Sequence, residues 1–285
     1  MTPHVPMRAL DTLWFQVAGT LCNIECTHCF ISSSPTNRSH AMLSLVDVQS
    51  RLAEARTLGV KEYYFTGGEP FLNREMIPIL AATLQQGPAT VLTNGMLLRK
   101  EICRQLRELS DGSEYSLDLR VSLDGYDAAS HDAIRGAGVW DRVMIGLHNL
   151  GDVGINPVIT VTETADGVRS DEGRARFLDL VRSFGFTKPR LKVLPLFRIG
   201  AEEQRSRAYE AWERIPEAEL TPADAEMLQC SSCRMVTSKG VYVCPILIDA
   251  PDARMGATLI ETLRPFPLRY GACHTCWVEG VSCRT

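Results

Sequence analysis

The sequence predicts an α/β fold, in which a partial barrel of six parallel strands precedes a small cysteine-rich C-terminal domain. Short apolar runs alternate with longer amphipathic stretches as far as residue 196, and this alternation is typical of βαβ units that build a parallel sheet. Six such units fall short of the eight in a closed barrel, which predicts a partial (β/α)6 barrel. Cysteine then crowds the segment after residue 229, which has turn residues and little helical periodicity.

Each element of the barrel follows from its local pattern. Strands are expected at the short apolar runs, which are residues 13–18, 60–65, 90–92, 117–123, 157–161 and 191–196. Helices are expected where apolar residues recur at helical spacing, at residues 45–58, 74–86, 97–109, 139–150 and 175–184. Gly59 is a typical stop signal for the first of these helices. Ligands of parallel α/β sheets gather at the carboxyl ends of the strands, so we expect the functional residues there.

The chain beyond the last expected strand divides into two parts. Residues 198–214 are rich in charge and are expected to form a solvated helix or a connecting segment. Pro216 and Pro222 bracket a linker, so the predicted domains are residues 1–215, the barrel with its connecting segment, and residues 216–285. A C-terminal domain of that size builds only a weak apolar core, and bound metal is a usual remedy.

The composition argues against nucleic-acid and membrane partners. The 34 Asp and Glu residues outnumber the 30 Lys and Arg residues, a net charge of −4, whereas nucleic-acid binding needs a basic surface. No apolar run approaches the roughly 18 residues of a membrane helix, and the N-terminus has no apolar signal core. We therefore expect a cytoplasmic protein. In that reducing compartment the ten cysteines are expected to be ligands or catalytic groups rather than disulfides.

Three cysteines, Cys22, Cys26 and Cys29, lie close together directly after the first expected strand. Thiolates at this spacing suit zinc or an iron–sulfur cluster. A structural zinc normally takes four protein ligands, so three thiolates favour a [4Fe–4S] cluster with one iron open to a substrate or cosubstrate. His28 is a candidate fourth zinc ligand, although its neighbours leave little room for a tetrahedron. Structural zinc and unliganded thiols both stay open at this point.

The C-x3-C-x2-C stretch closely resembles the signature of the radical S-adenosylmethionine (SAM) superfamily. Further motifs of that family follow the next strands, at residues 67–70 (GGEP), 93–95 (TNG), 122–125 (SLDG) and 134–136 (IRG). The resemblance covers about residues 10–200 and implies a partial radical SAM barrel. It also implies that Cys22, Cys26 and Cys29 ligate three irons and that SAM chelates the fourth. Reductive cleavage of SAM then gives a 5′-deoxyadenosyl radical, which removes a hydrogen atom from the substrate.

The same resemblance assigns roles in binding SAM. Gly67 and Gly68 would let the backbone approach the methionine amino group, because neither has a Cβ. Glu69 would offer this ammonium a carboxylate. Ser122 and Arg135 would bind the methionine carboxylate. Each of these residues also has a role that needs no ligand. The glycines would form a plain turn, Ser122 would cap a strand end, and Arg135 would form a surface ion pair.

Four more residues are candidates on the same basis. Asn94 would contact the ribose, unless it serves only its turn. Asp124 would reach the ribose or the substrate, and the backbone of His28 would face the adenine edge. Asp124 and Glu163 lie near strand ends and are our candidates for a catalytic general base.

The second group of cysteines comprises Cys230, Cys233, Cys244, Cys273, Cys276 and Cys283. Its two C-x2-C pairs by themselves suit one structural zinc. Behind a radical SAM barrel, the segment resembles a SPASM or twitch domain, which carries auxiliary [4Fe–4S] clusters. Gly240 before Cys244 fits that pattern with three intervening residues instead of four, and the full pattern has seven cysteines. We expect one auxiliary cluster, with a second left open. Two ligand sets are equally compatible: Cys233, Cys244, Cys273 and Cys276, or Cys230, Cys233, Cys244 and one later cysteine.

Auxiliary clusters in relatives accept an electron from a substrate radical or bind the substrate. The resemblance therefore implies an oxidoreductase that dehydrogenates a small molecule, with a flavodoxin or ferredoxin as electron donor. Cys22 lies too early for the leader-binding domain of many peptide-modifying relatives, and Pro245 after Cys244 argues against sulfatase maturation. A peptide-modifying maturase that forms cross-links or other side-chain modifications is nevertheless the alternative function. The cysteines are also compatible with an electron-transfer iron–sulfur protein and with a zinc-stabilised binding module. Cys103, alone in an expected helix, is interpreted as a buried hydrophobe.

Overall fold

Strands and helices alternate along most of the chain. The computed structural model describes residues 2–164 and 167–280. Its strands are β1 (His4–Val5), β2 (Thr12–Gln16), β3 (Glu62–Thr66), β4 (Ala89–Thr93), β5 (Leu117–Ser122), β6 (Val158–Thr162), β7 (Arg190–Leu194), β8 (Cys233–Thr237), β9 (Gly240–Tyr242), β10 (Arg254–Gly256) and β11 (Phe266–Pro267). Its α-helices are α1 (Leu45–Leu58), α2 (Met76–Thr83), α3 (Lys100–Asp111), α4 (Ala128–Arg135), α5 (Val139–Asp152), α6 (Asp171–Ser183), α7 (Ala201–Arg205), α8 (Pro222–Met227) and α9 (Gly271–Val278). Short 3₁₀ helices include η1 (Pro70–Leu72) and η2 (Gln229–Ser231).

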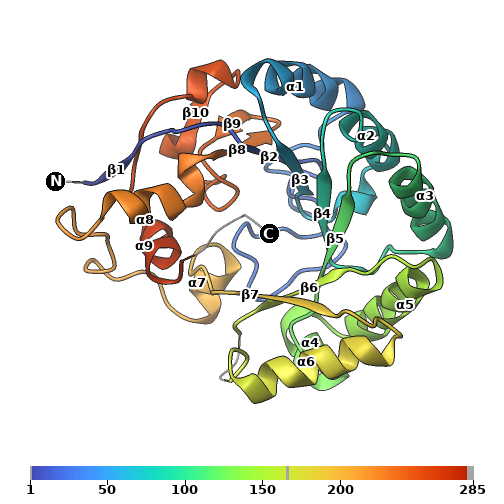
Figure 1. The fold of residues 1–285 in the computed structure, drawn as a ribbon. Coiled ribbons are helices and arrows are strands. Elements are labelled where there is room, and N and C mark those ends of the chain that lie inside the picture. Colours follow the sequence, from blue (N-terminus) through green and yellow to red (C-terminus); the bar gives the residue numbers. More distant parts are fainter. Residues whose placement is uncertain (1, 165–166, 281–285) are drawn as a thin grey trace.

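Six parallel strands form the centre of the structure. Strands β2 to β7 pair in chain order, and every neighbouring pair in this series is parallel. Helices α1 to α6 lie around the outside of the curved sheet (Figure 1). The prediction of an α/β partial barrel is therefore confirmed. Helices α1 to α6 do not cover the inner face of the barrel, so this face and the carboxyl ends of the strands can contact other parts of the chain or bind ligands.

The first helix shows how local sequence sets an element. The Ser44 side chain accepts a hydrogen bond from the Asp47 N–H, and the Asp47 carboxylate accepts one from the Ser44 N–H. This capping box starts α1. Gly59 ends it in the left-handed conformation, with a φ of 74° that glycine adopts without steric cost. The helix spans the residues that its sequence pattern predicted.

The sheet carries a different core on each face, because side chains alternate along a strand. On the outer face Phe15 and Phe65 stack beneath the helices, with ring centroids 5.4 Å apart. On the inner face Trp14 and Tyr64 stack with centroids 4.4 Å apart and belong to a cluster formed largely by the C-terminal segment. The C-terminal segment therefore packs against the inside of the barrel.

The cysteine-rich segment extends the barrel sheet at its first strand. β8 pairs in parallel with β2, which places Met235 opposite Trp14. β9 and β10 continue the sheet in antiparallel pairs, so its order is β10-β9-β8-β2-β3-β4-β5-β6-β7. β11 returns to pair with β1 near the N-terminus. Figure 1 shows these orange and red elements beside the start of the barrel.

Some elements differ from the sequence prediction. α4 follows β5 where no helix was expected, and Asp127 caps it by accepting from the Ser130 N–H. Residues 198–214 form only the short helix α7, and the carboxylate of Glu213 is buried against Arg198 and Arg207. Short helices such as these depend on caps and tertiary contacts more than on periodicity. None of the helices in the described ranges is long and apolar enough to cross a membrane.

Candidate functional site

The first cysteine group lies on one loop at the carboxyl end of β2. Cys22 and Cys26 are buried, Cys29 is partly buried, and all three line one cavity inside the barrel. Backbone hydrogen bonds fix the loop, including Cys29 N–H to the Cys26 carbonyl at 3.2 Å and Cys22 N–H to the Ser34 carbonyl at 3.1 Å. The structure thus brings the predicted triplet together in one cavity wall.

The chemistry of these thiols suits a cationic metal group. Burial raises the pKa of Cys22 to about 11 and that of Cys26 to about 12. Nearby donors favour negative charge on sulfur: the Ser33 N–H lies 3.3 Å from the Cys29 sulfur, and an Arg135 nitrogen lies 3.9 Å from the Cys26 sulfur. Buried thiols become thiolates when they coordinate a metal ion. The donor set therefore fits a thiolate-bound metal group.

A site for a single metal ion needs its ligands closer together than a cluster does. Across the described ranges, no group of three or more His, Cys, Asp or Glu side chains is placed to hold one metal ion. Thiolates that bind an iron–sulfur cluster each ligate a different iron, so they lie farther apart than the ligands of one ion.

The GGEP motif is packed against the cysteine loop. The N–H of Gly68 donates to the Gly19 carbonyl at 2.9 Å, and the N–H of Glu69 donates to the Leu21 carbonyl at 3.0 Å. A Cβ on Gly68 would stand 2.0 Å from the Leu21 oxygen and 2.7 Å from the Cys22 nitrogen. Gly68 is therefore required for close backbone packing behind the first cysteine. Gly67 and Gly68 also line the cavity.

Glu69 lies behind the cavity wall. Its side chain is fully buried, and its two oxygens accept from the Phe71 N–H at 3.1 Å, the Thr93 hydroxyl at 2.8 Å and the Asn94 N–H at 2.8 Å. Burial raises the pKa of Glu69 to about 7 in spite of these donors. The carboxylate thus ties the end of β3 to the end of β4. Its expected contact with an ammonium is absent from these contacts and stays a prediction.

Asn94 reaches the cysteine loop from the end of β4. Its amide nitrogen donates to the Asn23 side-chain oxygen at 2.7 Å and lies 3.7 Å from the Cys22 sulfur. Asn94 and Ser122 line the cavity, where they were expected. Asn23 was missed by the sequence analysis, although its place directly after Cys22 was a usable signal.

A buried ionic group joins Asp124, Arg135 and His28. One Asp124 oxygen lies 2.7 Å from Arg135 Nε and 3.0 Å from His28 Nε2, and the other accepts from the Thr162 N–H at 2.7 Å. Burial alone would raise the pKa of Asp124, but Arg135 and His28 hold it well below its usual range. A carboxylate held in this way is a poor proton acceptor. Arg135 and His28 line the cavity, whereas Asp124 stands behind them and positions them.

Glu163, the other general-base candidate, lies beside the main cavity. It pairs with Arg169 at 2.7 Å and lines an adjoining pocket of about 530 Å³, which shares Pro195 and Leu196 with the main cavity. The cavity with the cysteine triplet does not include it among its lining residues. Glu163 therefore lies next to this cavity without lining it.

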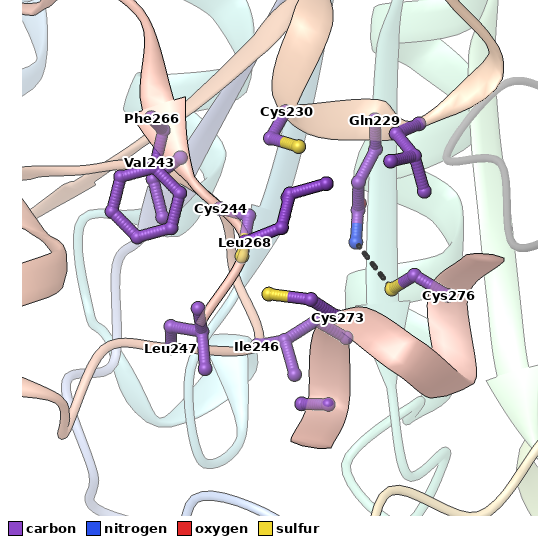
Figure 2. Close-up of a pocket in the computed structure, with 12 residues that line it drawn as sticks. Gln229, Cys230, Val243, Cys244, Ile246, Leu247, Phe266, Leu268, Cys273 and Cys276 are labelled. Carbon is purple, nitrogen blue, oxygen red and sulfur yellow. Dashed lines mark hydrogen bonds between the residues drawn. The ribbon is translucent and has the colours of Figure 1, made fainter. Parts of the chain in front are cut away.

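Four C-terminal cysteines meet in a second, small pocket. Cys230 comes from η2, Cys244 follows β9, and Cys273 and Cys276 lie one turn apart on α9. Figure 2 shows their sulfurs around one pocket, with the Gln229 amide 3.8 Å from the Cys276 sulfur. Burial raises the pKa of Cys273 to about 11 and that of Cys244 well above its usual value.

The remaining predicted cysteines behave differently. Cys233 begins β8 with its sulfur 3.9 Å from the Val243 carbonyl oxygen, and it is not among the residues that line the small pocket. Both expected ligand sets contain Cys233 and the second also contains Cys230, so the pocket agrees with the second set in Cys230 and Cys244, and the ligand set stays a prediction. Cys283 lies outside the described residues. Cys103 is fully buried in α3, as the sequence predicted.

The sequence matches the radical SAM superfamily over residues 17–181. This chain belongs to the radical SAM superfamily. The radical SAM chain is similar to the mycofactocin maturase MftC of Mycolicibacterium smegmatis, at 28% identity over 242 residues that cover 84% of it and 56% of the relative. It is similar to a GTP 3′,8-cyclase of Synechococcus sp., at 30% identity over 228 residues that cover 74% of it and 59% of the relative. It thus spans little more than half the length of either relative.

Among solved structures, the radical SAM chain resembles Streptococcus suis SuiB bound to precursor peptide SuiA. The TM-score is 0.69 at 17% identity, and the likeness covers 94% of this chain and 71% of that one. At this identity the likeness shows the fold alone. Family membership implies a SAM-binding [4Fe–4S] cluster. Because the relatives include a cyclase and a maturase, membership sets the cofactors and not the type of reaction.

Proposed function

We propose that this enzyme holds a [4Fe–4S] cluster on Cys22, Cys26 and Cys29 and cleaves SAM reductively. The observation that carries the proposal is three thiols from one loop, two of them buried and one partly buried, lining a cavity that contains an arginine 3.9 Å from one of the sulfurs. Cluster thiolates need such positive neighbours in a buried place. Three ligands from the protein leave one iron for a cosubstrate.

The chain's own residues prepare this cavity. When bound, the cluster and SAM supply one electron and a 5′-deoxyadenosyl radical that abstracts hydrogen from the substrate. Asp124 orients Arg135, whose guanidinium faces the cavity and is suited to the methionine carboxylate together with Ser122. Glu69 holds the Asn94 loop in place, and the backbone of Gly67 and Gly68 is the surface available to the methionine amino group. His28 shields the site on its Asp124 side.

We propose an oxidative outcome, the dehydrogenation of a small molecule. The four cysteines of the second pocket are a complete ligand set for one auxiliary [4Fe–4S] cluster. Gln229 and Ile246 line both this pocket and the main cavity. An auxiliary cluster there would adjoin the substrate and accept one electron from the substrate radical, while the proton released with it passes to water. A flavodoxin or ferredoxin in the cytoplasm would supply the first electron to the SAM cluster.

A peptide substrate is the second candidate. It is favoured by the structural likeness to SuiB, which binds a precursor peptide, and by the sequence similarity to the maturase MftC. The two candidates share the SAM chemistry and differ only in what occupies the cavity. Incubation with candidate small alcohols and with peptides, followed by mass analysis for loss of two hydrogens or for a cross-link, separates them.

Anaerobic reconstitution tests the common part. Two clusters give about eight irons and eight sulfides per chain, and a second auxiliary cluster gives about twelve. Dithionite and SAM are expected to yield 5′-deoxyadenosine and methionine. Cys26→Ala should lose about four irons and this cleavage, whereas Cys103→Ala, a buried cysteine outside both pockets, should keep them. Cleavage that persists in Cys26→Ala would refute the ligand assignment.

A further inference from the structure

The inner face of the barrel carries an arginine deep in the cavity. Arg120 lies on β5 two residues before Ser122, so both side chains share the inner face and Arg120 is one layer farther from the strand ends. It is 4% exposed and lines the cavity. Arg120 was not among the predicted site residues, although a charged residue within an apolar buried strand is a usable sequence signal.

The Arg120 guanidinium makes few polar contacts with the described part of the protein. Nη2 makes one long hydrogen bond of 3.5 Å to the Tyr64 hydroxyl, and the guanidinium carbon lies 5.1 Å from the centre of that ring. Within the described part of the chain, Nε has no hydrogen-bond partner and no carboxylate pairs with the group. Burying a charge is costly unless it is paired. A buried arginine in this state is suited to an anion from outside the chain.

Further unused donors belong to residues that line the same cavity. The Thr160 hydroxyl on β6 and the Trp14 ring N–H on β2 are buried, and neither has a hydrogen-bond partner among the described residues. Thr160 is in register with Ser122, so it lies diagonally across from Arg120. Trp14 stacks on Tyr64, which places an aromatic surface beside the guanidinium. The donors therefore stand around an apolar, aromatic wall.

The charged side chains that line the cavity are basic, so they favour the same kind of ligand as these donors, an anion. Its described lining includes Arg120, Arg135 and Lys192 and contains no Asp or Glu side chain. Arg135 is already paired with Asp124, and Lys192 lies opposite Thr160 on β7. Among the described lining residues, the space near Arg120 thus has basic side chains and no carboxylate; the Glu62 carboxylate lies beyond the Tyr64 hydroxyl, which donates to it at 3.2 Å.

We infer that Arg120 and Thr160 recognise a carboxylate of the substrate, held beside the Trp14–Tyr64 aromatic surface. The Nε and Nη2 edge of Arg120 matches the two oxygens of a carboxylate, and the Thr160 hydroxyl donates a third hydrogen bond. The inference rests on the proposed function and goes further by naming the substrate class. The substrate is an organic acid with an apolar body, either a free acid or an acidic side chain of a peptide.

Calorimetric titration of the reconstituted, SAM-loaded and unreduced enzyme tests this. The probes are phenylacetate with its neutral analogue phenylacetamide, and a terminally capped tripeptide with a central Glu or Gln. The acid of one pair is expected to bind at least about tenfold more tightly than its amide, and the pair that discriminates tells a free acid from a peptide. Equal binding of acid and amide in both pairs, or no binding of any probe, overturns the inference.

Variants assign the effect to the named groups. Arg120→Met should lower the affinity for the acid by about tenfold or more, and Thr160→Val should lower it by a few-fold. Arg182→Gln, an exposed arginine on α6 that pairs with Asp179, is the matched control and should bind like the wild type. Iron content and the thermal unfolding temperature of each variant show whether it is folded, and replacement of a buried charge by an apolar side chain of similar volume is often tolerated.

Two further measurements separate a failure of this inference from a failure of the proposed function. If Arg120→Met loses affinity for SAM but not for the acid, the guanidinium belongs to SAM and the inference is overturned. SAM cleavage by the wild type is measured separately: an enzyme that discriminates the acid but never cleaves SAM refutes the proposed function, and one that cleaves SAM without discriminating refutes only this inference.

Discussion

Replacing Gly68 by alanine tests whether the GGEP segment positions the cysteine loop. Gly68 does not have a positive φ, so alanine suits the backbone conformation and the effect is steric. The new Cβ would stand 2.0 Å from the Leu21 oxygen and 2.3 Å from its carbonyl carbon, whereas non-bonded carbon atoms prefer about 3.5 Å. The backbone beside Cys22 must therefore move by about 1 Å or more.

A displacement of this size has two expected effects. Overpacking in a buried place costs about 1–3 kcal/mol of folding stability. A shift of about 1 Å at a catalytic group lowers the rate by about a hundredfold. We expect Gly68→Ala to bind fewer of the four irons assigned to Cys22, Cys26 and Cys29, and to form 5′-deoxyadenosine about a hundredfold more slowly.

The assay combines iron analysis with chromatography of the SAM cleavage products under anaerobic conditions. Gly112→Ala is the control, because Gly112 has a φ of −85° at the end of α3 and its added Cβ would come no closer than 3.3 Å to another atom. Full iron content together with wild-type cleavage in Gly68→Ala would refute the reasoning that this glycine positions the cluster loop.

Three other predictions follow from the buried groups. Asp124→Asn removes the anion shared by Arg135 and His28, and breaking such a buried pair costs about 3–5 kcal/mol, so calorimetry should show a lower unfolding temperature; an unchanged temperature contradicts the positioning role. Cys244→Ala should lose about four irons and keep a cluster whose electron paramagnetic resonance signal responds to SAM; retention of all iron would remove Cys244 from the auxiliary ligands. Because burial raises the pKa of Glu69 from 4.5 to about 7, its contribution to the free energy of unfolding is fully present below pH 4.5 and falls by about 3 kcal/mol as the pH rises through 7. Urea unfolding between about pH 5 and 8 should show this fall in the wild type and a flatter profile in Glu69→Gln.

Local pattern was enough for the barrel strands and their helices. The capping box at Ser44 and the stop at Gly59 bound α1 at the predicted residues, because both signals act within a few residues. The triplet Cys22, Cys26 and Cys29 is likewise confined to one loop, so its residues share a cavity wall wherever the loop packs. Short helices such as α4 escaped prediction because they have too few residues to show a period.

Local sequence pattern could not predict which side chains contact one another across the fold. Glu69 and Asp124 have motif positions that suggest contact with a ligand, yet their oxygens accept hydrogen bonds from Thr93 and Asn94 and from Thr162 and Arg135. Thr93, Asn94 and Thr162 lie at other strand ends, and Arg135 ends α4. A sequence motif identifies a residue at the edge of a sheet, whereas its neighbours there depend on the order and register of the strands.

The sequence alone determined the α/β class with a parallel sheet and the place of the cysteine triplet, since the patterns that predict them lie within short stretches of the chain. The tertiary structure decided that β8 pairs with β2, that Cys230 lines one pocket with Cys273 and Cys276, and that Arg120 lines a cavity whose described lining residues include no carboxylate. The physical reason is that these contacts join segments far apart in the chain. Burial and charge balance then emerge only when the C-terminal segment packs against the inner face of the barrel.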